Sequence, residues 1–127
     1  MLKRLLLIAV VTAFSCEIKK ESASVNIIEI SNSGVLGKAI FKKTNKGTQL
    51  TVTATGKNTT VAAHIHGGNE CDYIDGSAAA GHWNPTGEAH GYWGTKSFHS
   101  GDQGNIKQNS EGRGKLVVVD NNNEVES

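Results

Sequence analysis

Histidine is confined to one segment of this 127-residue chain, and this placement limits what the chain can fold into. The five histidines are His64, His66, His82, His90 and His99. Imidazole is the commonest side-chain ligand for metals in proteins, so a group of this kind favours a metal site. A fold that serves such a site has to bring distant parts of the segment to one point in space.

The first two histidines lie two positions apart in a stretch, residues 60–66, whose composition predicts a β-strand. Alternate residues of a strand point to the same face, so the side chains of His64 and His66 face one side. Such a pair can start a metal site, although two solvated histidines on a strand surface would give the same pattern. The residues that follow strengthen the interpretation of this pair as part of a metal site.

Four further potential ligands follow in a glycine-rich segment: His82, His90, His99 and Asp102. Three imidazoles with one carboxylate would complete the tetrahedral shell that Zn²⁺ prefers, and imidazole also suits Cu²⁺. The alternative is a flexible loop whose rings are solvated. A loop so rich in glycine has little reason to fold without an ion, so we expect a metal site here.

Around this segment the chain consists of short strands and turns, which predict an all-β sandwich or barrel. Residues 49–55 show this best, because Leu50, Val52 and Ala54 alternate with threonines and predict one buried face. The 15 glycines and the single proline also suit strands and loops better than helices. We expect strands at 25–30, 35–42, 49–55, 60–66 and 114–120, with a long loop-rich region at 67–113.

The N-terminus has the features of an export signal. Lys3 and Arg4 precede ten apolar residues, 5–14. That stretch is too short for a bilayer core, which needs about 20 residues, and it matches the apolar region of a signal peptide. The residues up to Cys16 resemble a lipobox, so we expect cleavage after Ser15 and a lipid on Cys16. A plain signal peptide with an incidental cysteine is the alternative.

These features predict a signal peptide at 1–15, a lipidated cysteine and tether at 16–24, a folded domain at 25–120 and a polar tail at 121–127. The protein would then lie in the periplasm or at the outer membrane, held by its lipid. The net charge is only +1, and no basic run could follow a phosphate backbone. We therefore expect no nucleic-acid partner.

The histidine segment resembles the metal-binding region of the copper/zinc superoxide dismutase family. The resemblance rests on four linked motifs that occur in the same order and with the same spacing. The fold it implies is a Greek-key β-sandwich or barrel, immunoglobulin-like, with a long metal-binding loop. The motifs are His64-Ile65-His66, Gly81-His82-Trp83-Asn84-Pro85, His90-Gly91 and His99-Ser100-Gly101-Asp102-Gln103-Gly104-Asn105.

The resemblance also implies an activity, cofactors and residue roles. The family is an oxidoreductase family that disproportionates superoxide to dioxygen and hydrogen peroxide, with copper and zinc as cofactors. His82 would be the catalytic residue that bridges the two metals. The ligand sets implied are His64, His66 and His82 for copper, and His82, His90, His99 and Asp102 for zinc.

The family pattern is matched only in part. No histidine follows His99 to act as the family's fourth copper ligand, and the family's late arginine has no counterpart. Cys71 matches a cysteine that the family pairs in a disulfide, but the only other cysteine is Cys16. We therefore expect the C-terminal strands to be missing. Either the chain is a fragment or a truncated product, or another chain supplies the rest, as a homodimer or a complementing chain. A non-catalytic zinc- or copper-binding lipoprotein and an inactive truncated product are the alternatives.

Overall fold

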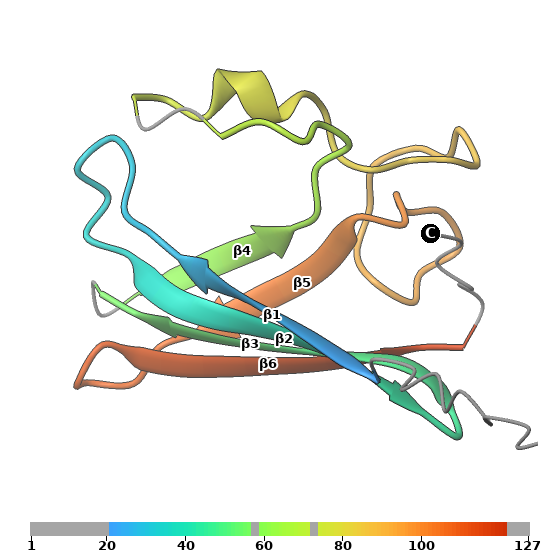
Figure 1. Cartoon of the computed structure of the whole chain (residues 1–127), viewed down its shortest axis with the longest axis horizontal. Coiled ribbons are helices and arrows are strands. Elements are labelled where there is room, and N and C mark those ends of the chain that lie inside the picture. The colour runs from blue at the N-terminus through green and yellow to red at the C-terminus, as the bar shows by residue number, and fades with distance from the viewer. Residues whose placement is uncertain (1–20, 57–58, 72–73, 122–127) are drawn as a thin grey trace, which may run out of the picture.

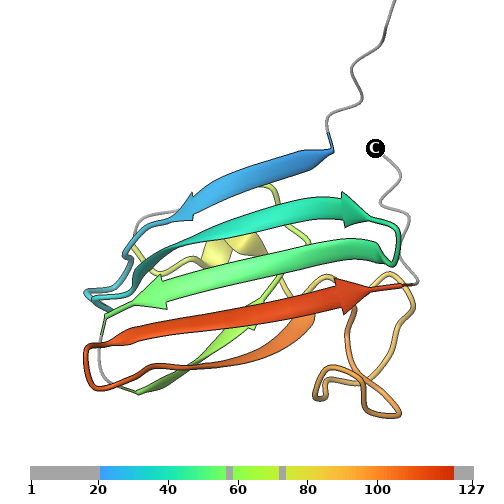
Figure 2. The same ribbon diagram turned by 90° about the horizontal axis from the view of Figure 1, so that it is seen from below.

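The computed structural model describes residues 21–56, 59–71 and 74–121, which form two antiparallel β-sheets (Figures 1 and 2). The larger sheet has the strand order β1-β2-β3-β6, and the smaller one pairs β4 with β5. None of the described segments forms a helix that is long and apolar enough to cross a membrane. The elements are β1 (Ser22–Ile27), β2 (Leu36–Thr44), β3 (Gly47–Thr55), β4 (Thr60–His64), the 3-10 turn η1 (Ser77–Ala79), β5 (Asp102–Lys107) and β6 (Arg113–Asp120).

The hairpin between β2 and β3 sets the register of the larger sheet. Thr44 pairs with Gly47 across a two-residue turn, and the Thr44 hydroxyl donates a hydrogen bond to the Gly47 carbonyl oxygen over 2.8 Å. Gly47 has a φ of 113°, and a Cβ there would lie 2.0 Å from the carbonyl oxygen of Asp120. Glycine is therefore required both by the turn and by the close approach of β6.

The core lies on the inner face of the larger sheet. Leu50, Val52 and Ala54 are buried, Thr51 is half-buried, and Thr53 and Thr55 are exposed, which confirms the predicted alternation along this strand. The same face receives Ala39 from β2 and Val118 from β6, and Ile106 reaches it from β5. The family's all-β architecture is thus present in the described residues.

Strand β5 lies within residues 67–113, which the sequence predicts only as a loop-rich region. Its sequence, DQGNIK, has a single aliphatic residue and a glycine, so neither period-2 alternation nor β-propensity marks it as a strand. Tertiary context forms it instead. It pairs with β4, and Ile106, Asp102 and Gln103 are buried between the sheets and the loop.

Each of the five predicted strands differs from the observed one by one to three residues at one end or both, as β1 and β4 illustrate. β1 begins at Ser22 and ends at Ile27, so the predicted tether extends three residues too far, because Ser22, Ala23 and Ser24 pair with β2. β4 ends at His64, where a bulge shifts the register between Ala63 and His64. The predicted signal peptide, Cys16 and most of the polar tail lie outside the described residues.

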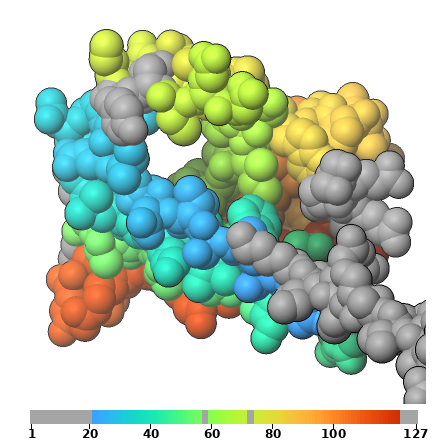
Figure 3. All heavy atoms as spheres, viewed as in Figure 1, coloured from blue at the N-terminus to red at the C-terminus, as the bar shows by residue number. Residues whose placement is uncertain are grey.

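An apolar hollow of about 540 Å³ lies between the two sheets and opens to the surface. Its walls include Val25 and Ile27 of β1, Val52 of β3, and Val61 of β4. Figure 3 shows the molecule hollowed at this place, between the turn that follows β1 and the segment that follows β4. Among the described strands, β1 and β4 each have only one neighbour, so both edges that flank the hollow are unpaired.

Candidate metal centre

The end of β4 and the start of β5 bring the two ends of the histidine segment together. His64 is the last residue of β4 and pairs with Asp102, the first residue of β5. Two residues beyond β4, His66 forms an isolated bridge with His82. The loop from 67 to 101 therefore starts and finishes at the same place, and its second half carries His90 and His99 back toward Asp102.

Asp102 is the centre of this arrangement and is only 2% exposed. Its Oδ2 accepts hydrogen bonds from the backbone N–H groups of Gly91, over 3.1 Å, and His99, over 2.9 Å. Burial by itself would raise the pKa of the Asp102 carboxyl. The bonds from Gly91, His99 and His82 outweigh burial and hold this pKa well below its usual range. The group is therefore an ionised carboxylate whose orientation is fixed by the loop backbone.

Three imidazoles converge on this carboxylate through their Nδ1 atoms. Nδ1 of His82 lies 2.7 Å from Oδ1, Nδ1 of His90 lies 3.0 Å from Oδ2, and Nδ1 of His99 lies 3.5 Å from Oδ1. The Nδ1 atoms of His82 and His99 are 3.5 Å apart. One ligand atom from each of the four residues can be chosen so that all lie within 4.8 Å of one another.

These separations fit a tetrahedral zinc ion. Zinc–ligand distances of about 2.0–2.1 Å place tetrahedral ligand atoms roughly 3.3 Å apart, which falls among the observed N–O and N–N distances. Three neutral imidazoles and one carboxylate also form a common zinc donor set. The structure thus brings together all four residues that the sequence predicts as zinc ligands, in an arrangement that could hold a metal ion.

The residues predicted to bind copper lie beside this group. The ring of His64 stacks on that of His82, with centroids 4.0 Å apart and planes 19° apart. The ring of His66 meets His82 edge-on, with centroids 5.2 Å apart. Nδ1 of His66 lies 2.8 Å from the carbonyl oxygen of Ala80, to which it can donate, and this leaves Nε2 for another partner.

The protonation of His64 also suits ligation. Burial lowers the pKa of His64, and a positive charge on the nearby His82 ring would lower it further. A neutral imidazole is the form that binds metals. His82 therefore stands between two groups: its Nδ1 is directed at Asp102, and its ring lies against His64 and His66.

Side-chain hydrogen bonds and one pair of aromatic rings hold the loop together. The Asn84 side chain donates to the carbonyl oxygen of Glu88 over 2.8 Å and accepts from its N–H over 3.0 Å. The Ser97 hydroxyl donates to the Glu88 carboxylate over 3.0 Å, and the Trp93 and Phe98 rings pack with centroids 5.1 Å apart. These contacts fold the loop segment that carries His90 and His99.

Sequence reasoning missed two functional contributors, the backbone N–H groups of Gly91 and His99. Both hold the Asp102 carboxylate, but a backbone donor leaves no side-chain signal in the sequence. A Cβ on Gly91 would lie 2.1 Å from the Ser97 carbonyl oxygen, so the requirement for glycine there is steric. Cys71 is exposed and forms no disulfide within the residues that the structure describes.

We predict that Asp102→Asn lowers zinc affinity at least about 100-fold, because the amide places a donor or a neutral oxygen where the three Nδ1 atoms converge. Competition with a chromophoric zinc chelator would measure this. Asp75→Asn, which alters an exposed carboxylate outside the group, is the control and should change affinity less than about twofold. Equal affinity for both variants would contradict the assignment of Asp102.

Comparison with known proteins identifies the family. The model of the family described as copper/zinc superoxide dismutase matches residues 35–127, which include every residue of the candidate centre. The Cu-Zn superoxide dismutase 2 of Aquifex aeolicus (strain VF5) is 31% identical over 115 residues, which cover 89% of this chain and 65% of the relative. The Cu-Zn superoxide dismutase 1 of the same organism is 34% identical over 86 residues, which cover 66% of this chain and 51% of the relative.

The chain thus spans about two thirds of the length of the first relative and about half of the second. The family model covers most of the chain, and the geometry of the four predicted zinc ligands agrees with the metal named for that family. This chain belongs to the copper/zinc superoxide dismutase family.

Proposed function

We propose that this chain disproportionates superoxide at a copper/zinc centre, as its family membership suggests. The observation that carries the proposal is the position of His82, which contacts the predicted zinc group through Nδ1 and the two predicted copper ligands through its ring. A centre in which one imidazole bridges copper and zinc requires a histidine at this position between the two ligand groups. Two superoxide anions and two protons would give one dioxygen and one hydrogen peroxide.

In this proposal, different sets of residues would hold the two metals. His82, His90, His99 and Asp102 would hold zinc, and His64, His66 and His82 would hold copper. Bound copper would supply the electron exchange between two superoxide anions, while zinc stays redox-silent. Nε2 of His82, the nitrogen that does not face Asp102, would either hold copper or, when it is free of the metal, carry a proton, and this proton would be one of the two that the peroxide product needs.

A second candidate function is metal binding without turnover. The nearly parallel rings of His64 and His82, 19° apart, direct their in-plane lone pairs side by side and not toward one point. The chain offers only three imidazoles for the copper side, since the other two histidines face Asp102. The four predicted zinc ligands converge on one point, whereas the predicted copper ligands do not, and this difference favours a protein that binds zinc without turnover.

Superoxide dismutation by the chain loaded with Cu²⁺ and Zn²⁺ separates the two candidates. We predict activity above that of free copper, and a loss of about 100-fold or more in His82→Ala, which removes the shared ligand and the proton carrier. Both chains would carry Cys71→Ser, so that the exposed thiol captures no copper. Activity no higher than that of free copper, with one zinc bound per chain, would contradict dismutation and support metal binding alone.

We also propose that the protein is a lipoprotein of the periplasm or outer membrane, anchored through Cys16. The support is the sequence of the first 16 residues, which combines a basic start, an apolar stretch and a lipobox-like end. Bacteria fed radiolabelled palmitate should label the protein and retain it in the membrane fraction, and Cys16→Ser should abolish both. An unlabelled, membrane-free protein would contradict the anchor.

A second copy or a complementing chain is the further partner that we propose. The unpaired edges of β1 and β4 and the apolar hollow between them support this pairing. Sedimentation equilibrium of the whole chain should detect a species heavier than the 13.5 kDa chain in the presence of a reductant, which excludes cross-linking through Cys71. A monomer at all concentrations would contradict a homodimer.

A further inference from the structure

Three segments that are far apart in the sequence meet through a closed set of backbone hydrogen bonds. The N–H of Ile65 donates to the carbonyl oxygen of Gly101, the N–H of Gly101 donates to that of Trp83, and the N–H of Trp83 donates to that of Ile65. Each of these bonds is 2.8 Å long. Each residue therefore gives one bond and receives one, and we call this set the amide triangle.

The amide triangle lies beside the candidate ligands of both metal groups. Its three corners belong to the segment after β4, to the middle of the loop and to the turn before β5. A shift of any corner would move ligands on both sides of His82. The adjacent ligands are His64 and His66, which flank Ile65; His82, which precedes Trp83; and Asp102, which follows Gly101.

Gly101 is the corner where space is tightest. A Cβ at this position would lie 2.3 Å from the carbonyl oxygen of Ile65, 2.9 Å from the nitrogen of Trp83 and 3.1 Å from its carbonyl oxygen. All three are backbone atoms of the amide triangle, so no flexible side chain could move aside to make room. The φ of Gly101 is not in the left-handed region, so the need for glycine comes from close packing alone.

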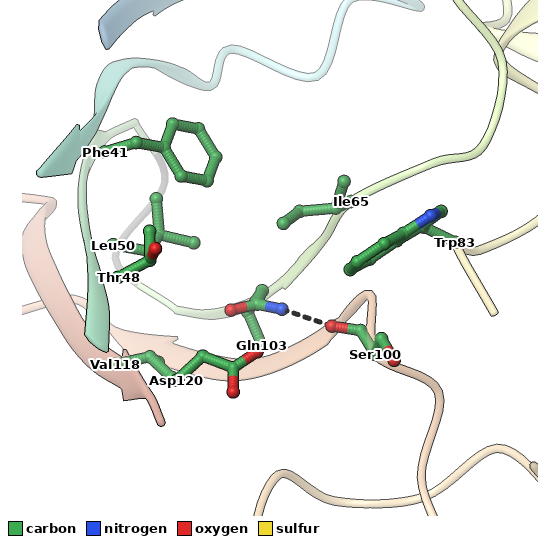
Figure 4. Close-up of a pocket in the computed structure, with 9 residues that line it drawn as sticks. All are labelled: Phe41, Thr48, Leu50, Ile65, Trp83, Ser100, Gln103, Val118 and Asp120. Carbon is green, nitrogen blue, oxygen red and sulfur yellow. Dashed lines mark hydrogen bonds between the residues drawn. The ribbon is translucent and has the colours of Figure 1, made fainter. Parts of the chain in front are cut away.

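The side chains of the triangle anchor it to the β-structure. Ile65 and Trp83 line a small pocket with Gln103, the residue after Asp102 (Figure 4). Gln103 is buried, and its Nε2 donates to the carbonyl oxygen of Ser100, next to Gly101, over 2.8 Å. The backbone around Gly101 is thus held both by the amide triangle and by the Gln103 side chain.

We propose that the amide triangle assembles the ligand backbone before any metal binds, and that Gly101 is a positioning residue for both metal groups. This inference rests on the proposed metal function, because it assigns a role to residues beside the ligands. It differs from ligation itself, since no atom of the triangle would contact a metal. In the metal-free protein, the triangle would keep the loop ends closed while the rings still lack their ion.

Gly101→Ala tests the positioning role, with Gly81→Ala as a matched control. Gly81 precedes His82 in the same loop, and a Cβ there would meet no heavy atom within 4 Å. We expect Gly101→Ala to lower zinc affinity by at least about tenfold and to weaken the visible absorption of tetrahedral cobalt(II) bound in place of zinc, while Gly81→Ala stays within about twofold. Unchanged affinity and cobalt spectrum in Gly101→Ala would overturn the proposal.

Hydrogen exchange on the unmodified, metal-free whole chain tests preassembly and does not depend on how the variant folds. The amides of Ile65, Trp83 and Gly101 should exchange at least about 100-fold more slowly than in an unstructured peptide. Exchange at the unstructured rate would overturn the proposal. If the unmodified chain binds no zinc, the proposed metal function fails, and slow exchange would still support the triangle as a preformed structure.

Discussion

The Asp102 carboxylate is the feature on which the rest of the centre depends. It is nearly inaccessible to solvent, and a buried charge of this kind is costly unless hydrogen bonds compensate for it. Two backbone N–H groups and the Nδ1 atom of His82 do so, and they come from different parts of the loop. The requirement to satisfy this one charge therefore draws the loop together around a single point.

The β-structure supplies the fixed end of this arrangement. Pairing of β4 with β5 places His64 opposite Asp102, and the amide triangle continues the contact beyond the end of the strands. The larger sheet adds a core of only a few aliphatic side chains, and the hollow between the sheets leaves that core open on one side. Metal binding would therefore stabilise a domain whose apolar burial is modest for its length.

Much of the site could be predicted from the sequence, and less of the fold. Local patterns can be recognised in the sequence without knowledge of the tertiary structure. They include the alternation at Leu50, Val52 and Ala54 and the spacing of the histidines. Strand β5 and the donor role of Gly91 arise from tertiary context, because a polar strand and a backbone amide carry no periodic signal. The stacking of His64 on His82 likewise depends on packing that no spacing rule contains.

Zinc K-edge X-ray absorption of the whole chain, loaded with one zinc ion, tests the central claim most directly. The claim is that Asp102 and the three histidines that face it form a closed tetrahedral zinc site. It predicts a shell of three nitrogens and one oxygen at about 2.0–2.2 Å, with the scattering typical of imidazole. A sulfur ligand at about 2.3 Å, which would indicate Cys71, or a six-coordinate oxygen shell would contradict it.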